Sequence, residues 1–385
     1  MQINSIIKKI YISKSSLKDW VTEIILKEYS HEICEVIEDR QIPNHPTYNQ
    51  KQVLWLTQSK GDIVKGCPGT DKSYLCCRYQ VINHTMNCPL NCTYCILQYY
   101  LNQPAIVIYT NFDTIIEELK TKLRSQPNRL IRISTGELGD SLAFKGSRLF
   151  AAEVFKAFQE FPNVMFEIKS KLTIMDDLFS IPNNGNIVFS WSLNPQDIVD
   201  REESMADSIS RRLQTAKQAQ EMGFLTGFHF DPILCIEDWE KKYNQLIEEI
   251  YNTVEQDKIP WISMGSLRFP PSMKDKIIEH YPLTKIVYRE MINGMDGKMR
   301  YVRPLRVKMY KFIYDKLSNT SNPPFIYFCM ESPLVWQEVM GYSPNTNIHL
   351  DWMFADSIYN RFNILTRKPN MEYYDNALNL DGSEF

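Results

Sequence analysis

Three cysteines in one short loop constrain this chain more than any other feature. Cys88, Cys92 and Cys95 occur in the order C-x3-C-x2-C within the sequence CPLNCTYC. Cysteine thiolate is the ligand that iron–sulfur clusters require, and three thiolates this close can bind three irons of a 4Fe-4S cubane. The fourth iron then keeps an open coordination position, whereas four ligands close a structural zinc site. The loop therefore predicts an iron–sulfur cluster with one open iron; a zinc knuckle or three buried thiols are the alternatives.

The composition is that of a globular protein. The 385 residues are 44% hydrophobic and 23% charged, and no run approaches the ~18 apolar residues of a membrane span. The N-terminus lacks a secretion signal, so we expect a soluble, cytoplasmic protein with no membrane partner. Nine cysteines in such a chain indicate metal or redox chemistry rather than disulfides. A net charge of -3 predicts no general affinity for nucleic acid, so any such affinity needs a local basic patch.

From residue 79 onward, β-prone apolar runs alternate with amphipathic helix candidates. Strands alternating with helices indicate parallel βαβ units joined by right-handed crossovers. The pattern predicts an α/β fold, a partial (β/α)6 TIM-like barrel over residues 79–285, with its chemistry at the carboxyl ends of the strands. The expected strands lie at 79–83, 130–134, 164–168, 187–191, 225–230 and 261–265, and the expected helices at 113–125, 145–161, 203–222, 236–255 and 273–281.

The regions before and after the predicted barrel show other patterns. Residues 1–78 contain one short strand candidate at 10–12 and a helix candidate at 17–29, which predicts an N-terminal cap. Residues 286–385 begin with two turn dipeptides, Asn293-Gly294 and Asp296-Gly297, typical of a β-hairpin. A helix at 305–317, a strand at 325–330 and a helix after Pro333 should follow in this C-terminal extension, and the last twenty residues should be frayed.

The cysteine spacing resembles the signature of the radical S-adenosylmethionine (radical SAM) superfamily. The resemblance implies a 4Fe-4S cluster whose open iron chelates S-adenosyl-L-methionine (SAM) and cleaves it to a 5'-deoxyadenosyl radical, with a reduced flavodoxin or ferredoxin-type electron donor. It also implies that Tyr94 packs over the adenine or the cluster. Ser134-Thr-Gly136-Glu137 resembles the Gly-Gly-Glu segment that binds the methionine amino group. Lys171, Ser190 and Ser192, near the ends of the third and fourth strands, suit carboxylate and ribose oxygens.

Weaker matches, in order along residues 5–340, narrow the resemblance to the spore photoproduct lyases. They are Leu97-Gln98, Asp140, Phe189-Ser190, Arg268-Phe269 and Lys298-Met-Arg300-Tyr301. This resemblance implies an enzyme that binds duplex DNA, flips out a damaged thymine dimer and splits it by radical chemistry. Arg268, Arg300 and Tyr301 would contact the DNA. The basic stretch from Lys298 to Lys311, with six cations and no acid, independently suits a phosphate backbone.

Two departures bear on the reaction. The family has a hydrogen-donating cysteine at the position of Glu137 and a relay tyrosine at the position of Ile96. We hypothesise that Cys235, just past the fifth strand, is a substitute donor; Cys329, at the end of a later strand, is another conceivable one. A radical SAM enzyme acting on a peptide or modified nucleoside is therefore an alternative function, and a zinc-binding nucleic-acid module is a second.

A further group of cysteines precedes the first barrel strand. Cys67, Cys76 and Cys77 lie within eleven residues and could bind an auxiliary cluster or a zinc ion. His84 or Cys34 could complete such a site. Adjacent cysteines point to opposite faces of an extended strand, which disfavours Cys76 and Cys77 as ligands of one metal.

Overall fold

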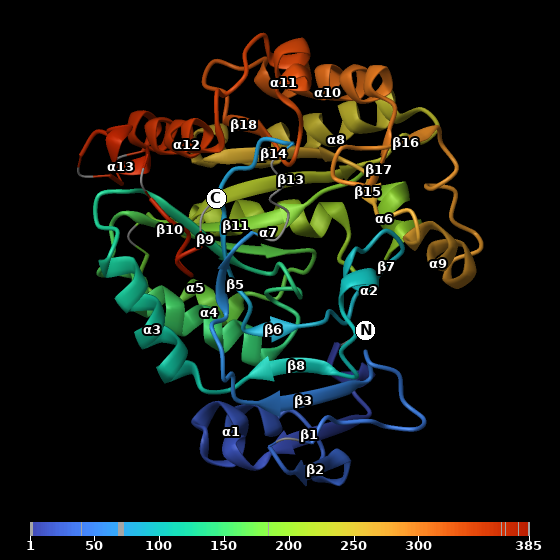
Figure 1. The fold of residues 1–385 in the computed structure, drawn as a ribbon, viewed down its shortest axis with the longest axis vertical. Coiled ribbons are helices and arrows are strands. Elements are labelled where there is room, and N and C mark those ends of the chain that lie inside the picture. Colours follow the sequence, from blue (N-terminus) through green and yellow to red (C-terminus); the bar gives the residue numbers. More distant parts are fainter. Residues whose placement is uncertain are drawn as a thin grey trace.

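An eight-stranded sheet curled into a half-barrel organises the molecule (Figure 1). The structure, a computed structural model, describes residues 3–39, 41–67, 73–183, 185–362, 364–365, 367–375 and 377–383. The strand order is β18-β14-β13-β11-β10-β9-β5-β4, and all neighbours are parallel except β4 and β5. The strands are β4 (Val64–Gly66), β5 (Gln80–Ile82), β9 (Ile131–Thr135), β10 (Val164–Ser170), β11 (Ile187–Ser192), β13 (Leu225–Ile233), β14 (Trp261–Ser266) and β18 (Phe325–Phe328). The predicted partial barrel is confirmed, and its six expected strands are β5, β9, β10, β11, β13 and β14.

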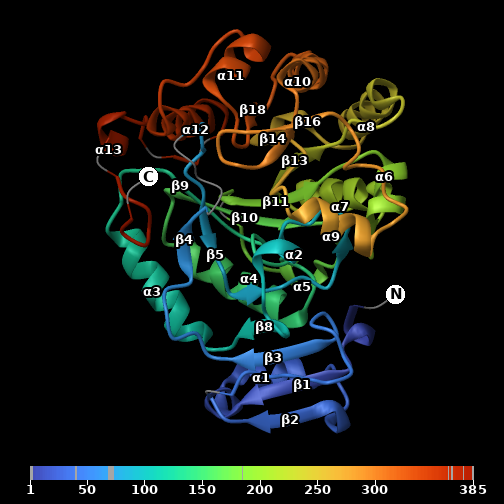
Figure 2. The same cartoon turned by 45° about the vertical axis from the view of Figure 1, so that its right-hand side comes forward.

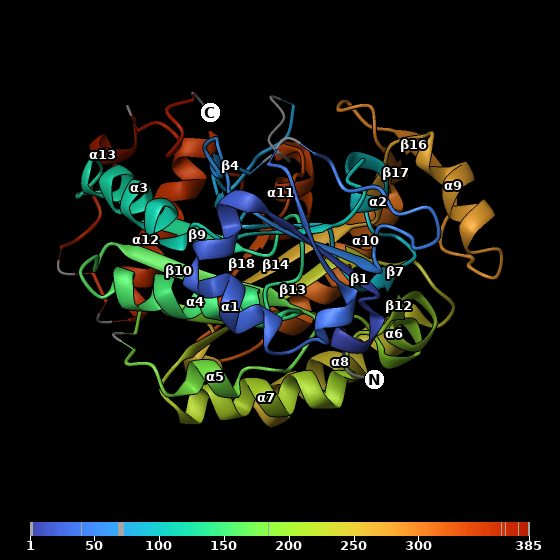
Figure 3. The ribbon, with the colours of Figure 1, turned by 90° about the horizontal axis from the view of Figure 1, so that it is seen from below.

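The strands in the middle of the barrel sheet are buried on both faces, most completely β9 and β14. Every residue of β9 and of β14 is buried, which is why parallel strands read as continuous apolar runs rather than alternating ones. Figure 3 shows α4, α5, α7 and α8 along the outer side of the sheet. The helices that connect the barrel strands are α3 (Phe112–Arg124), α4 (Lys145–Phe158), α5 (Asp176–Phe179), α6 (Gln196–Glu202), α7 (Ile209–Glu221) and α8 (Trp239–Thr253).

The eight-stranded sheet includes strands from outside residues 79–285, the range that the sequence predicts for the barrel. β4, assigned to the cap, pairs antiparallel with β5, and β18, assigned to the C-terminal extension, pairs in parallel with β14. Residues 79–285 therefore hold only six of the eight strands of this sheet. Periodicity identifies a strand but does not reveal which sheet it joins.

A second sheet lies below the barrel and has the order β2-β1-β3-β8-β6. The sequence predicts only one strand and one helix in this region. β8 follows the cysteine loop in the chain and inserts between β3 and β6, so this cap includes residues from beyond position 78. Its elements are β1 (Lys9–Ser13), α1 (Trp20–Leu26), β2 (Cys34–Ile37), β3 (Val53–Thr57), β6 (Thr85–Met86) and β8 (Ile106–Tyr109).

The C-terminal part covers the other end of the barrel, at the top of Figure 2. The predicted hairpin is present as β16 (Met291–Asn293) and β17 (Met299–Tyr301), and β17 also pairs with β15 (Arg268–Phe269). The helices here are α9 (Met273–His280), α10 (Arg303–Ser318), α11 (Pro333–Met340), α12 (Asn347–Arg361) and α13 (Glu372–Asp375). The expected fraying is wrong for Tyr374 and Leu380, which are buried. Among the described residues, no helix combines the length and apolar character that a membrane span requires.

Candidate functional site

The cysteine loop is held between two short elements at the open end of the barrel. Cys92 belongs to β7 (Asn91–Cys92), which pairs antiparallel with β12 (Glu203–Ser204). The Thr93 amide donates to the carbonyl oxygen of Glu202 at 2.9 Å, and the Thr93 hydroxyl donates to the Glu202 carboxylate at 2.5 Å. After Cys95 the chain enters α2 (Leu97–Tyr100). The segment between α6 and α7 therefore fixes the loop.

The three thiols of this loop are the type of ligand that an iron–sulfur cluster requires. Burial raises the pKa of the Cys88 thiol, and the nearby Asp140, Cys95 and Cys92 add to the effect, so the three sulfurs lie near one another. Yet among the described residues no three Cys, His, Asp or Glu side chains converge closely enough to hold one metal ion. In a 4Fe-4S cubane each thiolate binds a different iron, so the thiols surround the cluster without converging on a point.

Glu203 is the central charge behind the loop. Its carboxylate accepts hydrogen bonds from Lys171 Nζ at 3.1 Å, Arg212 Nη2 at 2.8 Å and the Tyr94 hydroxyl. Although burial favours the protonated form, Lys171 and Arg212 lower the pKa of Glu203 to about 2. Asn194 Nδ2 adds a contact at 3.2 Å. The structure therefore brings the predicted Tyr94 and Lys171 together, but through a glutamate that the sequence analysis missed.

The end of β9 makes a tight turn at the barrel mouth. Gly136 has a φ of +96°, and a Cβ there would lie 2.7 Å from the carbonyl oxygen of Lys169 and 2.6 Å from Ser141 Oγ. Only glycine combines this backbone conformation with so close an approach. Glu137 follows at the mouth, where its carboxylate lies 3.7 Å from Lys169 Nζ. Ser134 precedes the turn and is buried.

Asp140 ties the turn after β9 to the end of β10. Its carboxylate accepts hydrogen bonds from the Ser170 hydroxyl at 2.8 Å and from the amides of Lys171 and Leu142, each at 2.9 Å. Because Asp140 also acts on the pKa of Cys88, this anchored carboxylate lies beside the cysteine loop.

A buried polar network lies below the mouth inside the barrel. Glu167 accepts hydrogen bonds from Trp261 Nε1 at 3.0 Å and from the Ser190 hydroxyl, and it lies 2.8 Å from His229 Nε2. Ser190 is 1% exposed, and its hydroxyl donates to Glu167; its contact with the cofactor stays a prediction. Ser192 is half-buried two residues further along β11, and its carbonyl oxygen accepts from Arg212 at 2.7 Å.

A third group gathers at the mouth from β13, β15 and the residue that follows β18. Arg268 makes a two-pronged ion pair with Asp231 at 3.0 and 3.1 Å, and its Nη2 lies 3.2 Å from Cys329 Sγ. Burial raises the pKa of the Cys329 thiol to about 12. Burial lowers the pKa of Lys169, but the pKa is raised overall by the charges of Glu137, Glu167 and Cys329. Lys169 therefore lies among these groups.

The hairpin residues expected to contact DNA are turned inward. Arg300 is 1% exposed; it pairs with Asp296 at 2.6 Å and covers the Tyr74 ring at 4.3 Å. Tyr301 is fully buried, and its hydroxyl accepts from the Cys235 amide at 3.2 Å. The charge pattern alone could not show this, because a basic stretch on a strand and helix has both an inner and an outer face. Lys298 pairs with Asp296 at 3.4 Å.

In the second cysteine group the Cys76 and Cys77 side chains contact each other, against the expectation that adjacent cysteines point apart. The Cys67 amide donates to the Tyr79 carbonyl oxygen, the Cys76 amide donates to Asn347 Oδ1, and the Cys77 carbonyl oxygen accepts from Arg132. His84 stacks on Phe150 in the core, and Cys34 belongs to β2 of the other sheet. Over the part of the chain that the structure describes, these side chains assemble no metal site. An auxiliary cluster or zinc stays a prediction.

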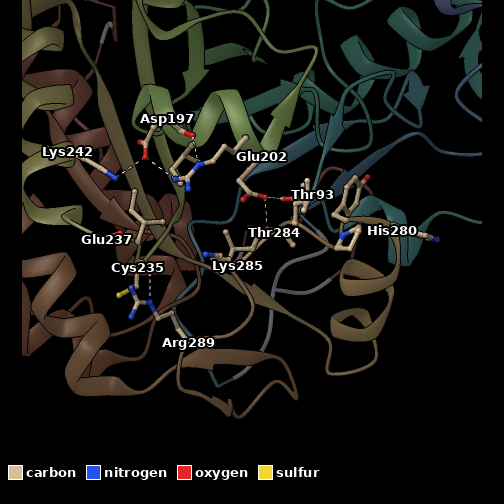
Figure 4. A pocket seen from close by; sticks show the side chains of 17 residues that line it. Thr93, Asp197, Glu202, Cys235, Glu237, Lys242, His280, Thr284, Lys285 and Arg289 are labelled. Atoms are coloured by element: carbon tan, nitrogen blue, oxygen red, sulfur yellow. Dashed lines mark hydrogen bonds and ion pairs between the residues drawn. The ribbon is translucent and has the colours of Figure 1, made fainter.

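Cys235 lies outside the barrel mouth, in the wall of a side cavity (Figure 4). This cavity of about 750 Å³ is bounded by α6, the segment after β13 and the segment between α9 and β16. Its lining includes Thr93 of the cysteine loop but none of the strand-end residues Glu137, Lys171 or Cys329. The hypothesis that Cys235 replaces the cysteine missing at position 137 therefore concerns a residue that faces a different space.

Comparisons with family models and with known proteins match this chain to one family. A family model described as "Spore photoproduct lyase" matches residues 8–329. The chain is 24% identical to the spore photoproduct lyase of Bacillus subtilis over 291 residues, which cover 74% of this chain and 82% of that protein. It is 21% identical to the Clostridium acetobutylicum spore photoproduct lyase over 230 residues, 60% of this chain and just under two thirds, 66%, of the relative.

Solved structures show the same fold. A spore photoproduct lyase double mutant with bound AdoMet and dinucleoside spore photoproduct superposes with a TM-score of 0.73 at 18% identity, and the match covers 84% of this chain and 98% of the other. A spore photoproduct lyase complexed with dinucleoside spore photoproduct matches with a TM-score of 0.71 at 19% identity, with the same coverage of both chains.

Proposed function

We propose that this chain, which belongs to the spore photoproduct lyase family, repairs a thymine photolesion in DNA by radical chemistry that starts at its cysteine loop. As a member of this family it is a radical SAM enzyme of the lyase type. The observation that carries the proposal is the position of the three-cysteine loop at the open end of a barrel whose strand ends bring Glu137, Lys169 and Arg268 to one mouth. A zinc-binding nucleic-acid module does not fit a member of this enzyme family.

Each part of the mouth has a role in this function. When bound, the cluster and SAM supply a 5'-deoxyadenosyl radical. Cys88, Cys92 and Cys95 would hold the cluster, and Glu203 braces their loop by binding Tyr94 and Lys171. The turn at Gly136 lets the backbone approach the methionine end of SAM, and the Glu137 carboxylate can accept from its ammonium group.

Cys329 is our candidate for the hydrogen-atom donor that completes repair, in place of Cys235. A donor needs an intact S–H bond, and burial keeps this thiol protonated at neutral pH. Arg268 and Asp231 hold it at the mouth, beside the Lys169 that pairs with Glu137. The S–H bond breaks as a C–H bond forms on the thymine radical. One electron from the low-potential donor and one proton from water then restore the thiol.

Contact with the DNA backbone would come from the outer face of α10. Of its cations, Arg306 is buried against Glu331, whereas Arg303, Lys308 and Lys311 are exposed. Exposed cations in one helix suit phosphates and give salt-dependent binding. The buried Arg300 and Tyr301 would reach DNA only if the hairpin moved.

One assay tests the function. The anaerobically reconstituted, chemically reduced protein is incubated with SAM and ultraviolet-irradiated DNA that contains spore photoproduct. Recovery of thymine together with 5'-deoxyadenosine supports repair. Formation of 5'-deoxyadenosine without repair favours the second candidate, a peptide or modified-nucleoside substrate. The observation that favours this candidate is that Glu137 and Ile96 replace the family's donor cysteine and relay tyrosine. Absence of 5'-deoxyadenosine would contradict both.

A further inference from the structure

We propose that the side cavity is the docking site of a small, acidic, one-electron carrier protein of the flavodoxin type, which reduces the cluster from outside the barrel. This inference rests on the proposed function, because reductive cleavage of SAM requires one electron at the cluster. The transfer makes and breaks no bond: the carrier loses one electron and the cluster gains it.

The cavity reaches the back of the cysteine loop. Thr93, directly after Cys92, lines it, and Tyr281 lines it next to Pro282. The Tyr281 hydroxyl donates to Asn91 Oδ1 at 2.7 Å, and Asn91 directly precedes Cys92 in the chain. A group seated in this cavity would therefore lie against Thr93, the residue that directly follows the cluster ligand Cys92.

This approach leaves the barrel mouth free. The strand-end residues that would meet SAM and the lesion, Glu137, Lys169 and Arg268, are absent from the cavity lining. Glu202 forms part of the partition, since its carboxylate accepts from Thr93 at 2.5 Å and from Thr284 at 2.7 Å. Electron donor and substrate could thus bind at the same time on opposite sides of the loop.

The rim has the composition of a protein interface. Lys285 and Arg289 lie in the segment between α9 and β16 that lines the cavity (Figure 4). In the same segment Leu283, which lines the cavity, is 93% exposed, and Tyr288, next to Arg289 in the chain, is 59% exposed. Exposed aliphatic and aromatic side chains beside cations are typical of protein-binding surfaces. A volume of about 750 Å³ is also large enough to admit the edge of a flavin or a cofactor-bearing loop.

The charge of the rim favours an acidic partner. Four cations and three carboxylates line the cavity. Arg201 and Lys242 both pair with Asp197, each at 2.9 Å, and Glu202 is buried, which leaves Glu237 as the exposed acid. Within the described residues, no ion pair forms at Lys285 or Arg289, although Arg289 Nε donates to the Cys235 carbonyl oxygen at 2.9 Å.

Charge reversal tests the inference. The double variant Lys285→Glu/Arg289→Glu is compared with Lys156→Glu/Lys217→Glu, which reverses two exposed lysines on α4 and α7. Binding of an acidic flavodoxin to the anaerobic holoprotein is measured by calorimetry. SAM cleavage is measured with reduced flavodoxin and, separately, with dithionite, a small reductant that needs no docking surface.

We expect the rim variant to weaken flavodoxin binding about tenfold and to slow flavodoxin-driven cleavage, with dithionite-driven cleavage unchanged. The control pair should change neither. Unaltered flavodoxin affinity in the rim variant would overturn the inference, and so would an equal loss of rate with both reductants or a loss of DNA binding alone. If the unmodified protein produces no 5'-deoxyadenosine even with dithionite, the proposed function fails, while the calorimetric affinities still decide the docking site.

Discussion

At the scale of single residues, the type of a residue did not predict which side chains it contacts in the site. The sequence points to Tyr94 and Lys171 through their positions near the cysteines and at a strand end, but their contact through Glu203 could not be predicted. Glu202 and Glu203 are adjacent in the chain, and both side chains are buried. Burial of two adjacent acids becomes understandable only when Thr93, Lys171 and Arg212 are placed around them.

Removing the Cys329 thiol should stop repair after radical formation. We expect Cys329→Ala to keep forming 5'-deoxyadenosine while thymine recovery falls at least about tenfold, because the product radical lacks its hydrogen source. In deuterium oxide, the unmodified enzyme should place one deuterium in the repaired thymine. Cys235→Ala is the matched variant and should repair normally. The reverse pattern, with repair lost only in Cys235→Ala, would assign the donor to the side cavity.

Glu203 should give the protein an acid-sensitive component of stability. Its pKa is lowered from 4.5 to about 2, so its ion pairs with Lys171 and Arg212 contribute fully above pH 4.5 and are lost as the pH falls toward 2. Denaturant titrations across this range should show a decline that Glu203→Gln makes shallower. A variant curve parallel to that of the unmodified protein would contradict this assignment.

At the scale of elements, the short connections decide the site. The sequence predicts one helix over 203–222, where the structure has the two-residue β12, which directly follows α6, and then α7. A two-residue strand has no periodicity to detect. Its pairing with β7 nonetheless fixes the cysteine loop. The segment Ser134-Thr-Gly136-Glu137 was recognisable from its likeness to a Gly-Gly-Glu segment, but the positive φ of Gly136 is known only from the structure.

Adding a methyl group at that turn should disturb the mouth. Gly136→Ala places a Cβ 2.7 Å from the Lys169 carbonyl oxygen, at a φ of +96°. We expect unfolding free energy to fall by about 1–3 kcal/mol, and the affinity for SAM, measured by calorimetry, to weaken. Gly61→Ala is the control, because no atom lies within 4 Å of the position that its Cβ would take. Unchanged stability and SAM affinity in Gly136→Ala would show that the turn relaxes.

At the scale of the whole molecule, remote segments complete the barrel. β18 joins the sheet from beyond the hairpin, and α12 packs its Asp351 into a cluster of buried arginines. Asp351 lies 2.8 Å from Arg129, 3.8 Å from Arg78 and 3.9 Å from Arg132. One carboxylate thus links α12 to β9 and to the segment before β5.

Neutralising that carboxylate should destabilise the whole fold. Asp351→Asn leaves buried arginine charge without its counter-ion, and we expect a loss of about 3–5 kcal/mol in unfolding free energy, seen as a lower midpoint in denaturant. Asp356→Asn on the same helix is the control, because this half-buried carboxylate accepts a hydrogen bond from Asn360 at the surface. Equal midpoints for the two variants would mean that the arginines find other partners.

The sequence by itself determined the chemistry that can begin here and the class of fold that supports it. Cysteine spacing is local, and six apolar runs alternating with helices leave few topologies, so both are legible from short windows. Only the tertiary structure decided which side chains share a space. It turned Arg300 and Tyr301 inward, brought Cys329 to the mouth and placed Cys235 in the side cavity. These outcomes depend on strand pairing and packing between residues far apart in the chain, which no local pattern encodes.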